Sequence, residues 1–176
     1  MRHIALTLVL ALAAGCSSDQ PPEPPKPLKA GEAGSMPLIT FDEVQQRLAE
    51  RDDKALLIVL WRAEDEGAGD LLETADALES RHAEAGLEVL ALNINMADGV
   101  RQRALPLVQE LDLDSLTVRA YQDDVMGLGA SLDPAWGGQT PAAFLFTRAG
   151  DRLFKGHGRD ALEGAAARIP AAVGKR

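Results

Sequence analysis

The sequence contains one cysteine, Cys16, in a chain of 176 residues. A single cysteine excludes an internal disulfide, which needs two thiols at a short and specific distance. The thiolate is also the nucleophile of thiol–disulfide exchange, so no residue after Cys16 can carry out that reaction. Most of the chain therefore lacks thiol chemistry of its own.

Positive charge is also scarce. Lys and Arg number 18 against 27 Asp and Glu, which gives a formal net charge of −9. Because nucleic-acid phosphates require clustered Lys and Arg, the composition predicts no nucleic-acid partner. Apolar residues make up 46 % of the chain, which is enough for a packed core, and the length fits one ordinary domain.

Apolar stretches long enough to span a bilayer are missing, since a membrane helix takes about 20 residues. The longest candidate, residues 4–14, follows the basic Arg2 and is typical of a secretory signal. The next residues, Leu-Ala-Ala-Gly-Cys at 12–16, resemble the lipobox of bacterial lipoproteins, although Ala13 stands where that motif favours Leu. An ordinary cleaved signal with a chance cysteine is the alternative.

The lipobox resemblance implies a signal peptide at residues 1–15 and diacylglycerol on the sulfur of Cys16. It places the protein in the bacterial cell envelope, bound to a membrane through its lipid and facing the periplasm or the exterior. More than one acyl chain makes such anchoring stable, because each buried methylene contributes about 0.8 kcal/mol. Five prolines lie between residues 21 and 27, so residues 16–35 are expected to form an extended stalk that carries a domain at 36–176.

Helices and strands alternate along that domain. Thr40 and Glu43 form a capping-box pattern that predicts a helix start at Thr40, and the continuous apolar run at 55–61 predicts a strand buried on both faces. Further helices are expected at 69–85, 100–111 and 159–172, strands at 87–94 and 116–121, a weak helix or turn at 124–130, and a hairpin of 142–147 with 152–156. This order predicts an α/β fold with a mixed sheet covered on both sides.

The strand LIVLW, the helix after it, the strand LEVLALNIN and the segment TPAAFLFTRAGDRL together resemble a thioredoxin-like domain of the bacterial membrane-tethered type, similar to the TlpA and ResA thiol-disulfide proteins. The resemblance covers about residues 40–170. It implies a three-layer sandwich with a mixed central sheet flanked by helices. It also implies a cis peptide bond between Thr140 and Pro141.

One departure from that family is large. Redox-active members have Cys-x-x-Cys shortly after the Trp, and alignment on Trp61 sets Asp65-Glu66-Gly67-Ala68 at that place. The motif is therefore absent, and the sequence predicts no catalytic residue and no cofactor. The acidic residues at 64–70 are expected to be solvated or to favour the helix start, with a hydrolytic carboxylate pair or a cation site as the alternative. Their spacing is not that of a calcium loop, so no metal site is predicted.

The histidines also predict no catalytic or metal site. His82 lies among charged residues in an expected helix, and His157 lies between two glycines after the hairpin. No zinc spacing and no Ser-His-Asp constellation can be assembled from them.

The leading functional hypothesis is a binding module. In thioredoxin-like proteins the backbone beside the cis proline pairs with an extended peptide, which needs hydrogen-bonding groups and no sulfur. The resemblance implies that Thr140 and Ala142, flanking Pro141, supply those groups. Trp61, Asp65 and Trp136 are expected to shape the groove, although Trp136 fits equally well as a residue that closes the core under a long loop.

Two other functions remain open from the sequence. The first is an enzyme of the thiol-disulfide oxidoreductase family that acts with an external thiol or a cofactor. The second is a structural lipoprotein that holds a complex near the membrane. The expected partner of the binding module is an envelope protein or peptide.

Overall fold

A computed structural model describes residues 36–51 and 53–174, with the backbone alone at position 101. The expected signal peptide at 1–15, the lipid site at Cys16 and the stalk at 16–35 lie outside the described residues. In the described part of the chain, no helix has the length and apolar character needed to cross a membrane.

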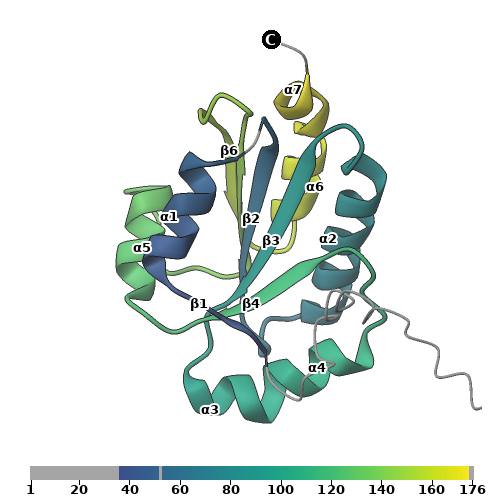
Figure 1. The fold of residues 1–176 in the computed structure, drawn as a ribbon. Coiled ribbons are helices and arrows are strands. Elements are labelled where there is room, and N and C mark those ends of the chain that lie inside the picture. The colour runs from purple at the N-terminus through teal and green to yellow at the C-terminus, as the bar shows by residue number, and fades with distance from the viewer. Residues whose placement is uncertain (1–35, 52, 175–176) are drawn as a thin grey trace, which may run out of the picture.

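The core element is a mixed six-stranded sheet with the strand order β1-β4-β3-β2-β5-β6 (Figure 1). Strands β1, β4, β3 and β2 run parallel to one another, and β5 is antiparallel to both of its neighbours, β2 and β6. The strands are β1 (Leu38–Ile39), β2 (Ala55–Trp61), β3 (Leu87–Asn93), β4 (Thr117–Tyr121), β5 (Ala142–Phe146) and β6 (Arg152–His157). The expected mixed sheet is confirmed.

Helices cover both faces of the sheet. Figure 1 shows α1 and α5 on one side and α2, α6 and α7 on the other. The buried residues form two clusters that match this arrangement. Val44 of α1 and Leu128 of α5 pack in one cluster, and Leu72 of α2 and Leu162 of α6 pack in the other. The helices are α1 (Phe41–Ala49), α2 (Ala68–His82), α3 (Ala97–Gly99), the π-helical η1 (Val100–Ala104), α4 (Leu105–Glu110), α5 (Val125–Leu132), α6 (Ala161–Ala166) and α7 (Ile169–Val173). This is the expected three-layer sandwich.

The local signals explain most element boundaries. All seven residues of β2 are buried, as the unbroken apolar run requires for a strand between two helical layers. Thr40 caps α1, and its side chain and that of Glu43 form the reciprocal capping box that the sequence predicts.

Two expected helices are divided. The helix expected at 100–111 is a π-helical turn followed by α4, and Pro106 lies in the first turn of α4. The helix expected at 159–172 is α6 followed by α7, with Pro170 in the first turn of α7. Proline has no N–H to bond to the carbonyl four residues earlier, so each proline begins a new helix. Strand β1, with two residues, was not expected from the sequence.

Candidate functional site

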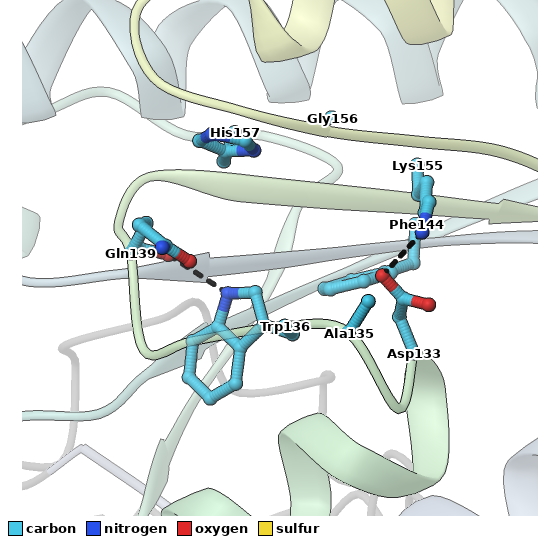
Figure 2. Close-up of a pocket in the computed structure, with 8 residues that line it drawn as sticks. All are labelled: Asp133, Ala135, Trp136, Gln139, Phe144, Lys155, Gly156 and His157. Carbon is cyan, nitrogen blue, oxygen red and sulfur yellow. Dashed lines mark hydrogen bonds and ion pairs between the residues drawn. The ribbon is translucent and has the colours of Figure 1, made fainter.

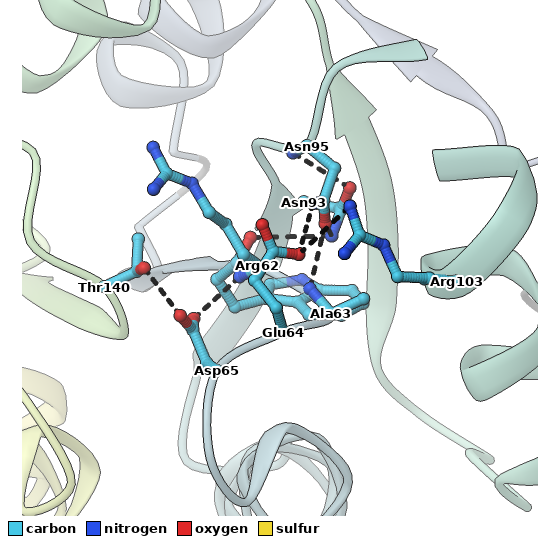
Figure 3. Close-up of polar contacts among 9 residues, drawn as sticks. Arg62, Ala63, Glu64, Asp65, Asn93, Asn95, Arg103 and Thr140 are labelled. Atoms are coloured by element: carbon cyan, nitrogen blue, oxygen red, sulfur yellow. Dashed lines mark hydrogen bonds and ion pairs between the residues drawn. The ribbon is translucent and has the colours of Figure 1, made fainter. Parts of the chain in front are cut away.

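The loop between β2 and α2 is tied to the loop that precedes β5. One carboxylate oxygen of Asp65 accepts a hydrogen bond from the Arg62 backbone N–H at 2.7 Å. Its other oxygen accepts one from the Thr140 hydroxyl, also at 2.7 Å (Figure 3). The acid that stands at the expected position of a nucleophilic cysteine therefore has a positioning role, because both of its oxygens hold neighbouring loops in place.

Two buried asparagines support the same loop from β3. The Asn95 side chain accepts hydrogen bonds from the Ala63 N–H at 2.8 Å and from the Asn93 amide at 2.9 Å, and it donates to Glu64 Oε2 at 2.6 Å. Asn93 is 0 % exposed and Asn95 is 5 % exposed. No role is predicted for these two residues from the sequence. The feature that could have pointed to them is the pair of polar residues, two positions apart, at the end of an otherwise apolar strand.

The same amide also fixes the charge of Glu64. The hydrogen bond from Asn95 lowers the pKa of the Glu64 carboxyl, and Arg103, whose Nη2 lies 4.0 Å from Glu64 Oε2, acts in the same direction. A general acid near neutral pH needs a raised pKa, so Glu64 is not suited to that role. Among the described residues, no group of three or more His, Asp or Glu is placed to hold a metal ion.

Helix α2 begins directly after this loop. Gly67 precedes it in the left-handed region, at φ +75°, where glycine has no steric penalty. Glu66 is exposed and forms an ion pair with Arg159 in the connection between β6 and α6. A cavity of about 470 Å³ lies beside this pair, and Pro141, Leu71 and Leu162 contribute to its lining.

The peptide bond between Thr140 and Pro141 is cis, as the family resemblance implies. Within 36–51 and 53–174, the structure gives the backbone N–H and C=O of Thr140 no hydrogen-bond partner. The Pro141 carbonyl, in contrast, accepts a hydrogen bond from the Gly158 N–H at 2.8 Å. With respect to the described residues, Thr140 thus offers a free donor and a free acceptor next to the Asp65 loop.

Ala142 does not fit the role expected for it. It is 0 % exposed and lies inside the sheet, opposite Leu60 of β2 on one side and His157 of β6 on the other. A residue with strand neighbours on both sides cannot pair with an added strand, so the expectation that Ala142 contacts a peptide is wrong.

The two tryptophans differ from the expected groove residues as well. Trp61 is 0 % exposed and packs in the core, so it has no surface in this structure that could shape a groove. Trp136 is 7 % exposed, packs in the other core cluster, and donates its indole N–H to the Gln139 carbonyl at 2.9 Å. Of the two roles left open for Trp136, the structure supports the core role, although its ring also forms part of a cavity wall (Figure 2).

Comparisons with known proteins agree on the fold. No protein-family model and no curated protein sequence matches the chain. Among solved structures, it is similar to a thiol:disulfide interchange protein of the thioredoxin family from Chlorobium tepidum, with a TM-score of 0.58, 12 % identity, and coverage of 72 % of this chain and 84 % of that one.

Two further structures show the same similarity. One is the exposed lipoprotein thioredoxin Etrx1 of Streptococcus pneumoniae, with a TM-score of 0.52, 16 % identity, and coverage of 69 % and 89 %. The other is a secreted Mycobacterium tuberculosis disulfide oxidoreductase homologous to DsbE, with a TM-score of 0.50, 14 % identity, and coverage of 68 % and 82 %. At these identities the likeness concerns the backbone alone, and this chain has the thioredoxin-like fold.

Proposed function

We propose that this protein is a membrane-anchored, redox-inactive thioredoxin-like lipoprotein that binds an extended peptide or protein segment at Thr140. The observation that carries the proposal is the unpartnered backbone of Thr140, described above. A peptide strand that pairs with this residue gains main-chain hydrogen bonds without any sulfur chemistry. The Asp65 hydrogen bond to the Thr140 hydroxyl holds the loop in place for such pairing.

The anchor is part of the same proposal. The lipobox-like residues 12–16 and the proline-rich segment 16–35 support a lipid on Cys16 and a stalk between the membrane and the domain. The described domain contains no cysteine, since Cys16 is the only one in the sequence. The partner would therefore be an envelope protein or peptide that the module holds near the membrane.

Binding can be tested with the full-length lipoprotein in detergent and a pool of fluorescein-labelled decapeptides. A photo-crosslinking benzoylphenylalanine replaces Met126, which is 54 % exposed and whose sulfur lies beside Gly138 in the same loop as Thr140. The matched control is the same replacement at Leu38, which is 65 % exposed on edge strand β1, at the opposite side of the sheet from β5. We expect peptide capture at position 126 and background at position 38.

Backbone pairing has a second, independent test. In a captured peptide, N-methylation of one backbone amide at a time should lower affinity strongly at one position and little at its neighbours, because a single residue pairs with Thr140. Equal capture at the two crosslinking positions, or affinity that ignores N-methylation, would contradict the proposal.

The second candidate function is a thiol-disulfide oxidoreductase that acts with an external thiol or cofactor. It is favoured by the similarity of the fold to thiol:disulfide interchange proteins. It is opposed by the absence of cysteine after residue 16. Insulin reduction by the full-length protein in the presence of glutathione, above the rate of glutathione alone, would support this candidate over the binding module.

A further inference from the structure

A cavity of about 390 Å³ lies between the face of β5 and β6 and the segment 133–139 that leads to Thr140 (Figure 2). This volume falls in the range of sites that hold small ligands or single side chains. Of the six residues expected to bind a peptide, Trp136 alone contributes to the lining of this cavity.

The middle of the cavity is apolar. Trp136 and Phe144 form its floor, and both are almost wholly buried, at 7 % and 1 % exposed. Figure 2 shows Gln139 and His157 at one end of the cavity and Lys155 with Asp133 at the other. An occupant therefore needs an apolar part that crosses the two rings.

The polar groups that remain available are mainly donors. The Gln139 side-chain oxygen already accepts a hydrogen bond from the Gly137 N–H at 3.0 Å, which leaves its amide N–H groups. The carboxylate of Asp133 already accepts from Lys155 at 2.7 Å and lies 3.4 Å from Arg152. The Lys155 side chain is 48 % exposed, and its ammonium has further N–H groups to donate. An occupant with acceptor atoms fits this set.

The charges beside the cavity also favour an occupant with acceptor atoms. The Asp133 side chain is 9 % exposed and faces two cations, Lys155 in the cavity lining and Arg152 just outside it, so these three groups together carry a net charge of about +1. Its hydrogen bond to Lys155 lowers the pKa of Asp133, which keeps that carboxyl ionised. In a chain with a net charge of −9, this is a local positive site that attracts an anionic group.

The cavity also adjoins the residue that would pair with a peptide. Gln139 directly precedes Thr140, and His157 lies opposite Ala142 at the start of β5. Alternate side chains of an extended peptide point to the same face, so one side chain of a strand paired with Thr140 would face this opening.

From these observations, and resting on the proposed function, we infer that the cavity is a specificity pocket for an acidic side chain of the bound peptide. The methylene groups of a Glu lie on Trp136 and Phe144, and its carboxylate accepts hydrogen bonds from Lys155 and from the Gln139 amide. The protein would thus select extended segments with a Glu at one fixed place relative to the residue on Thr140.

The test uses the full-length lipoprotein in detergent and a set of fluorescein-labelled decapeptides. In each peptide pool one position is fixed as Glu, Gln or Lys, and the other positions are randomised. At one position, we expect Glu to bind about tenfold more tightly than the isosteric Gln, and Lys to bind more weakly than both. The preference should weaken as salt is added, because the Lys155 side chain is partly exposed.

Variants separate the pocket from general charge effects. Lys155→Met should abolish the preference for Glu over Gln, and Lys155→Arg should retain most of it. The matched control is Lys54→Met, which removes the same charge from an exposed position outside the cavity and should keep the preference. Far-UV circular dichroism and the urea midpoint of each variant show whether it is folded at the assay temperature.

Two failures can be told apart. If peptides bind and crosslink beside Thr140 but Glu and Gln bind equally well, or if folded Lys155→Met keeps the Glu preference, the specificity pocket is overturned and the proposed function stands. If no peptide binds at all, the proposed function is overturned and the pocket with it.

Discussion

The buried carboxyl group of Glu79 shows how one residue can make stability depend on pH. Glu79 lies on α2, and one of its oxygens accepts a hydrogen bond from the Val89 N–H at 3.3 Å. Its other oxygen is buried, and within the described part of the chain no donor lies in good hydrogen-bond geometry to it. Burial raises the pKa of Glu79 to about 7, and the nearby carboxylates of Glu88 and Asp76 add to the shift.

The direction of the pH effect follows from these values. The ordinary pKa of a Glu carboxyl is 4.5, so between pH 4.5 and about 7 the folded protein holds a proton that the unfolded chain has lost. Stability from this group is therefore fully present below pH 4.5 and is lost as the pH rises through about 7. Glu79→Gln stays neutral at every pH, so it should be more stable than the natural protein at pH 8 and similar to it at pH 4.5. At pH 8 the free energy of unfolding should differ by an amount on the order of 1 kcal/mol, because solvent screens part of the effect.

Urea unfolding at both pH values measures this difference. Glu73→Gln is the matched control, because it makes the same change at an exposed position of the same helix. A Glu79→Gln variant whose stability relative to the natural protein is the same at pH 4.5 and pH 8 would show that the carboxyl is ionised in the folded state throughout.

Residue-scale predictions for the site were the least successful. Thr140, Pro141 and Asp65 lie close together as expected, but Pro141 is buried, and so are Trp61, Trp136 and Ala142. An apolar strand that is covered on both sides has no alternation, so the sequence cannot show which of its residues reaches a surface. The Asn93 and Asn95 pair was missed because its partners, Ala63 and Glu64, come from a different strand end.

At the scale of elements, the close packing of α5 against Trp136 is the clearest constraint. A Cβ atom added at Gly129 would lie 1.7 Å from Trp136 Cε3, a distance that no packed pair can have. Gly129→Ala must therefore displace the indole ring or the helix. We expect the free energy of unfolding to fall by at least about 1–3 kcal/mol. Trp136 fluorescence should change as well, because its ring is 7 % exposed in the natural protein.

Gly127→Ala, on the same helix, is the matched control. The added Cβ meets only the exposed side chain of Asp124, which can rotate away. Alanine favours helix over glycine by up to about 1 kcal/mol, so this variant should be as stable as the natural protein or slightly more stable. Equal effects of the two substitutions would show that Trp136 does not rest on Gly129.

Elements were predicted well where a local signal exists. The capping box of α1 and the apolar run of β2 are local, and both were confirmed. The division of two helices at Pro106 and Pro170 also has a local cause, which the periodicity of apolar residues masked. Strand β1 has no such signal, because two residues become a strand only through pairing with Ala120 and Tyr121 of β4.

At the scale of the whole molecule, the order of elements was enough to predict a mixed sheet covered on both sides, and the resemblance added the thioredoxin-like three-layer sandwich. The loop between β2 and α2 can be tested for whether it still has the geometry for a disulfide. The Ala68 N–H donates to the Asp65 carbonyl at 3.1 Å, which closes a turn at the start of α2. In such a turn the first and fourth Cα atoms lie within about 7 Å, close to the span that a disulfide requires.

The double substitution Asp65→Cys and Ala68→Cys should therefore form an internal disulfide without a change of fold. Placement of a thiol at the N-terminus of α2 also lowers its pKa, which favours the reactive thiolate. We expect oxidation to remove two titratable thiols per chain, and the reduced variant to reduce insulin where the natural protein does not. If both introduced thiols remain free in air while the far-UV circular dichroism spectrum is that of the natural protein, the loop holds positions 65 and 68 too far apart for a disulfide. The single substitution Asp65→Cys is the control, since one thiol can attack a disulfide but has no partner to release the mixed product.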